Sequence, residues 1–172
     1  MNKLTTAQAA AEASGAVITI QSEVGIEAAP FAAELCRMYL GYANRHHWAA
    51  EIRHSIVSDG GYKEVVIHVA GPDSYDRLKY ETGSHRAQRA PMAEAGWRIH
   101  TCLAKVTVLP EHGQSSMRRG VQLEDREVKI RTYNFLYGGV TDHRIKLGVQ
   151  HLPRVLDGDL DALIDALETT NQ

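Results

Sequence analysis

Residues 85–101, HRAQRAPMAEAGWRIHT, carry three arginines and two histidines on a framework of Ala, Pro, Met and Gly. Arginine side chains attract phosphate groups, aromatic and histidine rings stack on bases, and proline restricts a loop to few conformations. The segment therefore favours a loop that binds a polyanion. A solvated basic surface has the same composition, and the residues alone leave both interpretations open.

The charge of the chain is unevenly distributed. The 172 residues have a net charge of -2, which argues against a general nucleic-acid binder. Residues 77–105, however, hold six Lys and Arg against two acids, whereas residues 151–172 hold one Arg against five acids. A basic segment in a slightly acidic protein is a candidate polyanion footprint.

The composition is that of one globular unit with 44% apolar residues. No apolar run is long enough to cross a bilayer, and the first residues lack the apolar core of a secretory signal. We therefore expect a cytoplasmic protein with no membrane partner. Cys36 and Cys102 fall in a predicted helix and a predicted strand, which favours buried thiols over a disulfide.

Motifs of catalysis and of metal or cofactor binding are absent from the sequence. It contains no phosphate-binding glycine loop and no GxSxG, HExxH or CxxC string. His46 and His47 are adjacent, so on a helix they would point about 100° apart and make a poor metal pair. The carboxylates of 157–165 fit a solvated helix face better than a cation site. We expect no catalytic residues, no metal and no cofactor, and a binding protein rather than an enzyme.

Hydrophobic periodicity predicts an α+β fold, a two-layer sandwich of a mixed or antiparallel sheet with helices. Strands are expected at 16–21, 49–57 and 62–70 and up to residue 109, a long helix at 27–45, a short helix capped by Asp73, and two helices at the end. REVKIRTYNF and VTDHRIKLGV flank LYGG as a hairpin. Four regions follow: a flexible segment 1–15, a block 16–109, a linker 110–125 and a small block 126–172.

Three stretches of the chain resemble one known family. Residues 61–111 and 24–48 are similar to the codon-reading domain of bacterial class I peptide chain release factors, and residues 131–164 to the small domain packed on it. HRxQRxP…RIHT and YNF…VTDHRI are the most specific motifs, and the similarity is strongest to the type that reads UAA and UAG. The resemblance covers roughly three quarters of the chain and implies a release-factor domain 2/4-like fold.

The chain departs from this family in what it lacks. The family inserts a catalytic domain carrying Gly-Gly-Gln where this chain has the linker 110–125, and no GGQ occurs here. His112-Gly113-Gln114 is the nearest string, and we interpret it as coincidence. The resemblance also leads us to expect no counterpart of the family's N-terminal helical domain. The resemblance implies a codon-recognition superdomain alone.

The resemblance also implies a function. We expect a monomer that binds the ribosomal A site, contacting rRNA and mRNA, as a competitor, protector or adaptor. It would do so without peptidyl-tRNA hydrolysis, and a separate GGQ protein is a possible partner. The alternative is a fold repurposed off the ribosome to bind RNA, protein or a small ligand.

The resemblance assigns codon contacts to two segments. The family's Pro-x-Thr tripeptide matches Pro91–Ala93, so Ala93 replaces a threonine that bonds the first codon bases, and stop-codon recognition should be degraded. At the helix tip Glu27 is retained, while Val24 replaces a glycine that approaches the first base.

Further along the loop, His100 matches a histidine that stacks on the second base. Gln88 and Thr101 match third-base contacts. Ordinary roles remain open for two of them, because His100 also fits a core histidine and Gln88 a plain loop residue.

The remaining loop residues also have two readings each. Trp97 replaces a glycine and either stacks on a base or packs on the loop. Arg86, Arg89 and Arg98 are expected to contact rRNA phosphates, with internal pairing of Arg86 or Arg98 as the alternative. In the binding interpretation the arginines lie with Glu27 and His100 on one accessible surface.

Overall fold

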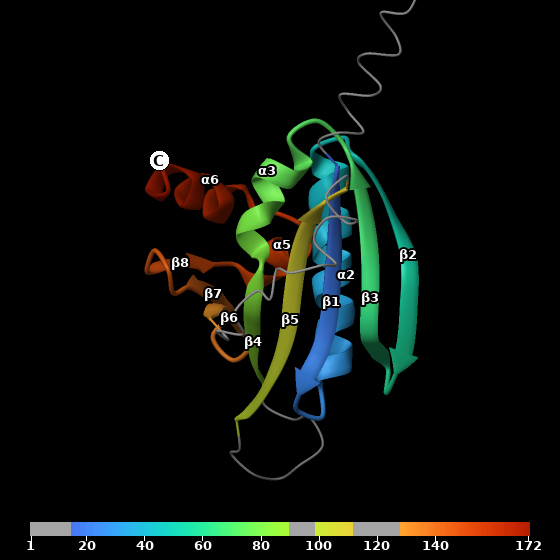
Figure 1. Ribbon diagram of the computed structural model, residues 1–172. Coiled ribbons are helices and arrows are strands. Elements are labelled where there is room, and N and C mark those ends of the chain that lie inside the picture. The colour runs from blue at the N-terminus through green and yellow to red at the C-terminus, as the bar shows by residue number, and fades with distance from the viewer. Residues whose placement is uncertain (1–14, 90–98, 112–127) are drawn as a thin grey trace, which may run out of the picture.

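The computed structural model describes residues 15–89, 99–111 and 128–172 and places their strands in one eight-stranded sheet (Figure 1). Across the sheet the strand order is β2-β3-β1-β5-β4-β6-β7-β8. The strands are β1 (Ala16–Val24), β2 (Ala49–Ser58), β3 (Gly61–Ala70), β4 (Gly83–Arg89), β5 (His100–Pro110), β6 (Lys129–Asn134), β7 (Gly139–Asp142) and β8 (Leu147–Gln150).

The sheet is mixed, because β4 and β6 run parallel while every other neighbouring pair is antiparallel. Strand β4 lies between β5 and β6 and so joins the two parts of the chain that flank the predicted linker. Parallel neighbours need a long connection, and here strand β5 lies between β4 and β6 in the sequence. Both parts therefore contribute to one continuous sheet.

Helices cover one face of this sheet, which confirms the predicted α+β class (Figure 1). The long helix α2 (Ala28–Arg45) buries an apolar stripe that includes Phe31, Leu35 and Met38. Ile18 and Ile20 alternate along β1 and belong to the same buried core, as expected for a strand with one face inside. Full burial of such a side chain contributes about 1.5–3 kcal/mol relative to exposure. Helices α5 (Leu152–Leu156) and α6 (Asp161–Thr170) complete this layer.

Three local predictions were wrong. The start of the basic segment is not a loop, because residues 83–89 form β4, which is bonded on both sides and buries His85 and Ala87. The predicted second hairpin strand breaks into β7 and β8. Asp73 precedes the short helix α3 (Ser74–Leu78), but in a left-handed backbone conformation and without a side-chain cap bond.

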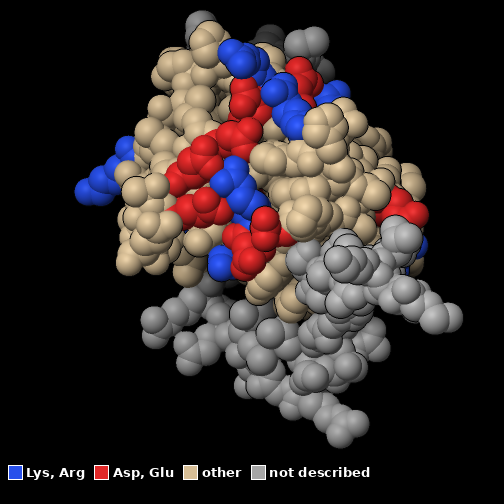
Figure 2. Space-filling view, turned by 90° about the horizontal axis from the view of Figure 1, so that it is seen from above, with Lys and Arg blue, Asp and Glu red and all other residues tan. Residues whose placement is uncertain are grey.

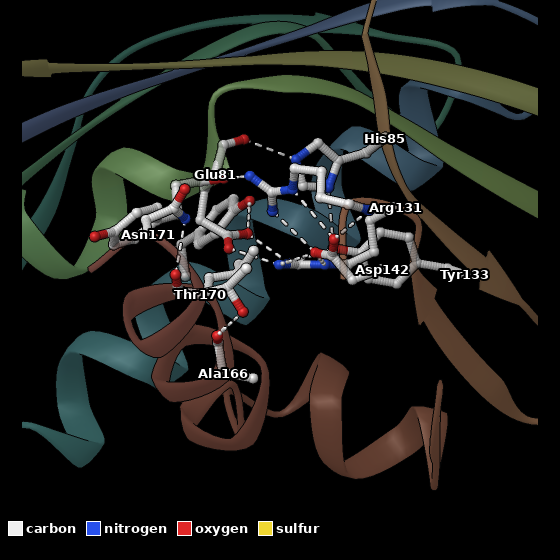
Figure 3. A network of polar contacts seen from close by, with 12 residues as sticks. Glu81, His85, Arg131, Tyr133, Asp142, Ala166, Thr170 and Asn171 are labelled. Atoms are coloured by element: carbon white, nitrogen blue, oxygen red, sulfur yellow. Dashed lines mark hydrogen bonds and ion pairs between the residues drawn. The ribbon is translucent and has the colours of Figure 1, made fainter. Parts of the chain in front are cut away.

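A buried network of charged groups fixes β4 relative to β6 and β7 (Figure 3). Arg131 donates two hydrogen bonds to the Glu81 carboxylate, at 2.6 and 2.8 Å, and two more to Asp142 at 3.2 and 3.3 Å. All three side chains have 0% exposure. Burial alone would raise the pKa of Glu81, but Arg131 beside it holds that pKa below its usual value.

Two rings complete this network. His85 Nδ1 lies 3.0 Å from the Tyr133 hydroxyl, and its Nε2 lies 2.9 Å from the Glu81 carbonyl oxygen. A carbonyl only accepts, so Nε2 carries the proton and Nδ1 accepts from Tyr133. This arrangement needs a neutral imidazole, and burial lowers the pKa of His85 to about 4.

At the end of the sheet that carries α3 and α6, acidic and basic side chains are interleaved (Figure 2). There Arg77 reaches from α3 to three carboxylates of α6, those of Asp161, Asp165 and Glu168. This pairing ties the C-terminal helix to the first block.

The cysteine prediction is confirmed. Cys36 and Cys102 are free and buried, and burial raises the pKa of each thiol to about 11. Within residues 15–89, 99–111 and 128–172, no helix is long and apolar enough to cross a membrane.

Candidate nucleic-acid interface

Four chain segments meet at the opposite end of the sheet, where α2 begins (Figure 1). They are the tip between β1 and α2 (residues 24–28), the end of β4 (88–89), the start of β5 (99–101) and the turn between β6 and β7 (134–139). We call these four segments the sheet-end platform. It brings together residues separated by up to about a hundred positions in the sequence.

The helix tip is docked on the start of β5 through a glycine. Gly25 has φ +106°, and a Cβ placed on it would lie 2.8 Å from the Thr101 carbonyl oxygen and 2.9 Å from the Cys102 Cβ. Both the backbone conformation and the close approach therefore require glycine. On either side of it, Val24 and Ile26 are 60% and 84% exposed. The tip thus presents two apolar side chains from a fixed backbone.

Arg89 is held by internal partners rather than by solvent. Its guanidinium donates to the Glu34 carboxylate on α2, lies 3.7 Å from the Glu27 carboxylate and stacks 3.9 Å over the Phe135 ring. Only 17% of the Arg89 side chain is exposed. Arg89 therefore connects β4, the helix tip and the β6–β7 turn, and its charge is already balanced by two carboxylates.

Arg86 lies on the other face of the sheet, because residues an odd number apart along a strand point to opposite faces. Its Nε donates to the Thr132 hydroxyl at 3.2 Å, and that hydroxyl lies 2.6 Å from His143 Nε2. The expectation that Arg86 and Arg89 share one accessible surface was wrong. Internal pairing of Arg86 with Glu81 is also ruled out, since Glu81 is bound by Arg131.

Gln88 and Thr101 lie directly opposite each other on neighbouring strands. Gln88 also faces Asn134 of β6, whose Nδ2 donates to the Gln88 Oε1 at 3.3 Å. His100 is half-buried and pairs in register with Arg89. The structure thus brings Glu27, Gln88, His100 and Thr101 to the same end of the sheet, with Gln88 and Thr101 on the face opposite to that of Arg89 and His100.

The platform can bind by hydrogen bonds and apolar contacts. Its described charges are the Arg89 guanidinium and the carboxylates that hold it, and exposed apolar side chains surround them, including Ile99 and Tyr137. Among the described residues no group of three His, Cys, Asp or Glu could hold a metal ion. These features suit recognition of bases more than attraction of phosphates.

Four predicted site residues, Pro91, Ala93, Trp97 and Arg98, lie outside the described residues. The sequence reasoning also missed two platform residues, Asn134 and Phe135, and Glu34 of α2, which pairs with Arg89. The one available signal was the position of Asn134 just before a predicted turn, where asparagine often bonds the backbone.

Known proteins of one family match most of this chain in sequence. The model of the PCRF domain matches residues 1–106. Peptide chain release factor 1 of Caldicellulosiruptor saccharolyticus is 36% identical over 225 residues, which covers 84% of this chain and 63% of that protein. The same factor of Thermoanaerobacter pseudethanolicus is 36% identical over 228 residues, covering 86% of this chain and 64% of that protein.

A solved structure shares the fold. The chain superimposes on RF2 of Thermus thermophilus with a TM-score of 0.76 and 23% sequence identity, over 90% of this chain and 67% of that one. This chain spans slightly less than two thirds of the relatives it matches in sequence.

The relatives also contain residues without a counterpart here. The alignment with the Caldicellulosiruptor protein spans 225 residues but includes only about 144 residues of this chain, which is 84% of 172. Roughly 80 residues of that span therefore have no counterpart here. A shortened interior accounts for that difference. The family model covers more than half of the chain, and the fold and the sequence relatives agree with it. The chain belongs to the peptide chain release factor family and carries its PCRF domain.

Proposed function

We propose that this protein binds the decoding site of the ribosome in the cytoplasm without hydrolysing peptidyl-tRNA and with weakened recognition of stop codons. It would act as a monomer that competes with full-length factors, protects the A site or works with a partner. The observation that carries the proposal is the sheet-end platform, in which positions matching the family's codon contacts are brought together while the sequence contains no GGQ.

The geometry of the platform supports binding. Gly25 fixes the helix tip on β5, Arg89 joins that tip to β4, and Asn134 joins β4 to β6. Such preorganisation lowers the entropy lost when a ligand binds. The positions that match the family's contacts with the second and third bases are retained as His100, Gln88 and Thr101.

Loss of hydrolysis follows from the missing tripeptide. In the family, GGQ on its own domain reaches the peptidyl-transferase centre, and this chain has neither. Purified protein should release no formyl-methionine from ribosomes programmed with UAA, UAG or UGA. Release above the background without factor would refute this part of the proposal, and release only with an added GGQ protein would identify the protein as an adaptor.

Weak codon discrimination follows from two replacements. Ala93 offers no hydroxyl to the first base, and the exposed Val24 side chain occupies a position where the family has glycine. Each lost base contact is worth about 1–3 kcal/mol of discrimination. The double variant Ala93→Thr/Val24→Gly should therefore regain a preference for UAA over CAA, which differ at the first base alone, of about tenfold or more.

Ribosome binding at two salt concentrations is the central test. The full chain should bind ribosomes with an empty A site, UAA or CAA with similar affinity, and more weakly at high salt. Absence of binding at low salt would refute the proposal and favour the off-ribosome alternative. Because Glu27 and Glu34 balance the charge of Arg89, this arginine contributes little to the attraction of phosphates.

A further inference from the structure

Asn134 has its amide orientation fixed by the turn that follows it. Its Oδ1 accepts hydrogen bonds from two backbone N–H groups, those of Leu136 at 3.0 Å and Tyr137 at 3.1 Å. Reversing the amide would place N–H groups against N–H groups, so the oxygen must face the turn. The Nδ2 group consequently points away from the turn and toward β4.

This orientation determines that of Gln88. The partner of the Asn134 Nδ2 group must be an acceptor, and the Gln88 Oε1 lies 3.3 Å from it. Gln88 is half-buried beside the exposed Thr101, on the same face of the sheet. With its oxygen engaged by Asn134, the Gln88 amide presents N–H donors to whatever docks on that face.

We propose that Asn134 is a positioning residue that makes Gln88 a donor-only reader of bases, so that the platform prefers guanine over adenine in the base that docks against Gln88. Guanine offers two acceptors, O6 and N7, on one edge, whereas adenine offers N7 and an N6 amino donor. Two Gln88 donors match the guanine edge, and the adenine amino group would face a donor. This inference rests on the proposed function, since it needs the codon to dock on the platform.

The test is the isosteric variant Asn134→Asp. A carboxylate still accepts from the two backbone N–H groups of the turn but cannot donate, so its second oxygen accepts from the Gln88 Nε2. The Gln88 amide then turns over and presents its oxygen outward, where it accepts from the amino group of adenine. The substitution changes the outward group of Gln88 from a donor to an acceptor without changing the size of the side chain at position 134.

Affinity is measured with the full chain on ribosomes whose A-site codons differ by one purine, UAG against UAA and UGA against UAA. The parent chain should bind the guanine codon of one pair about tenfold more tightly, and Asn134→Asp should reduce that ratio by about tenfold or invert it. The matched control is Gln88→Leu, in which the Asn134→Asp change should leave the ratio unaffected. If the parent and Asn134→Asp both bind ribosomes but show equal affinities for the two purines, the base preference is refuted while the proposed function stands.

A measurement on the free protein separates this result from failure of the proposed function. In spectra of the side-chain amides, the Asn134 amide protons should be protected from exchange in the parent, and the Gln88 amide protons in Asn134→Asp. If the protection follows this pattern but no ribosome binding occurs, the proposed function is refuted together with the base preference. Unprotected Asn134 protons in the parent would overturn the inference whatever the binding results.

Discussion

Replacing Arg131 with Met removes the buried cation that Glu81 and Asp142 share. Glu81 would lose two short hydrogen bonds and keep only the one from the Tyr39 hydroxyl at 2.9 Å, whereas Asp142 would keep Arg144 at 2.9 Å. Glu81 is therefore left as an uncompensated charge with 0% exposure.

Removing one partner of such a buried pair costs about 3–5 kcal/mol. For a chain of this size that corresponds to a fall in Tm of about 6–20 °C. Urea unfolding at pH 7, followed by circular dichroism, measures the free energy directly. The matched control is Arg154→Met, which removes an exposed pair with Asp159 and should cost no more than about 1 kcal/mol.

A second variant tests the cause of the loss. If the cost comes from the stranded carboxylate, the double variant Glu81→Leu/Arg131→Met should be more stable than Arg131→Met alone, because an apolar replacement of a buried pair is often tolerated. Equal losses for Arg131→Met and Arg154→Met, or further destabilisation in the double variant, would refute the reasoning.

Three further outcomes are expected. Burial lowers the pKa of His85 to about 4, so between pH 6.5 and 4 only the unfolded chain binds a proton at this residue. As the pH falls through that window, the free energy of unfolding should decrease by about 3 kcal/mol in urea melts. The decrease should be smaller in His85→Gln. Gly25→Ala should lower the free energy of unfolding by about 1–3 kcal/mol, through backbone strain and a steric clash. The loss should exceed that of Gly138→Ala, whose added Cβ would meet nothing within 4 Å. Equal decreases in Tm for the two variants would contradict the docking of the helix tip on β5. Arg89→Met should destabilise the fold, because the carboxylates of Glu27 and Glu34 lose the cation that they share. Thermal melts would detect the loss, and an unchanged Tm would show that Arg89 does not stabilise the fold.

Local sequence determined much of the framework. The apolar residues of α2 recur at helical spacing, and the alternation in β1 and β3 needs only the strand period, so these elements could be predicted without knowledge of their partners. The motifs around Gln88 and His100 likewise indicated the family and the positions of its codon contacts.

Tertiary pairing decided the nature of the basic segment. In the sequence, residues 85–101 have the composition of a basic loop, with proline and glycine among arginines and histidines. Strand β4 accepts them because β5 and β6 pair on both of its sides, Glu34 on α2 balances Arg89, and Tyr133 satisfies His85. Those partners are 48 and 55 residues away in the sequence, beyond the reach of any local pattern.

The same distinction applies to the candidate site. The resemblance of its motifs to a known family named Glu27, Gln88 and Thr101, because a motif is a local property of the sequence. It could not separate Arg86 from Arg89, since the direction of each side chain depends on the strand that carries it and on the layer beneath that strand. Nor could it show that Asn134 orients Gln88, because that contact exists only once β6 pairs with β4, 46 residues apart in the chain.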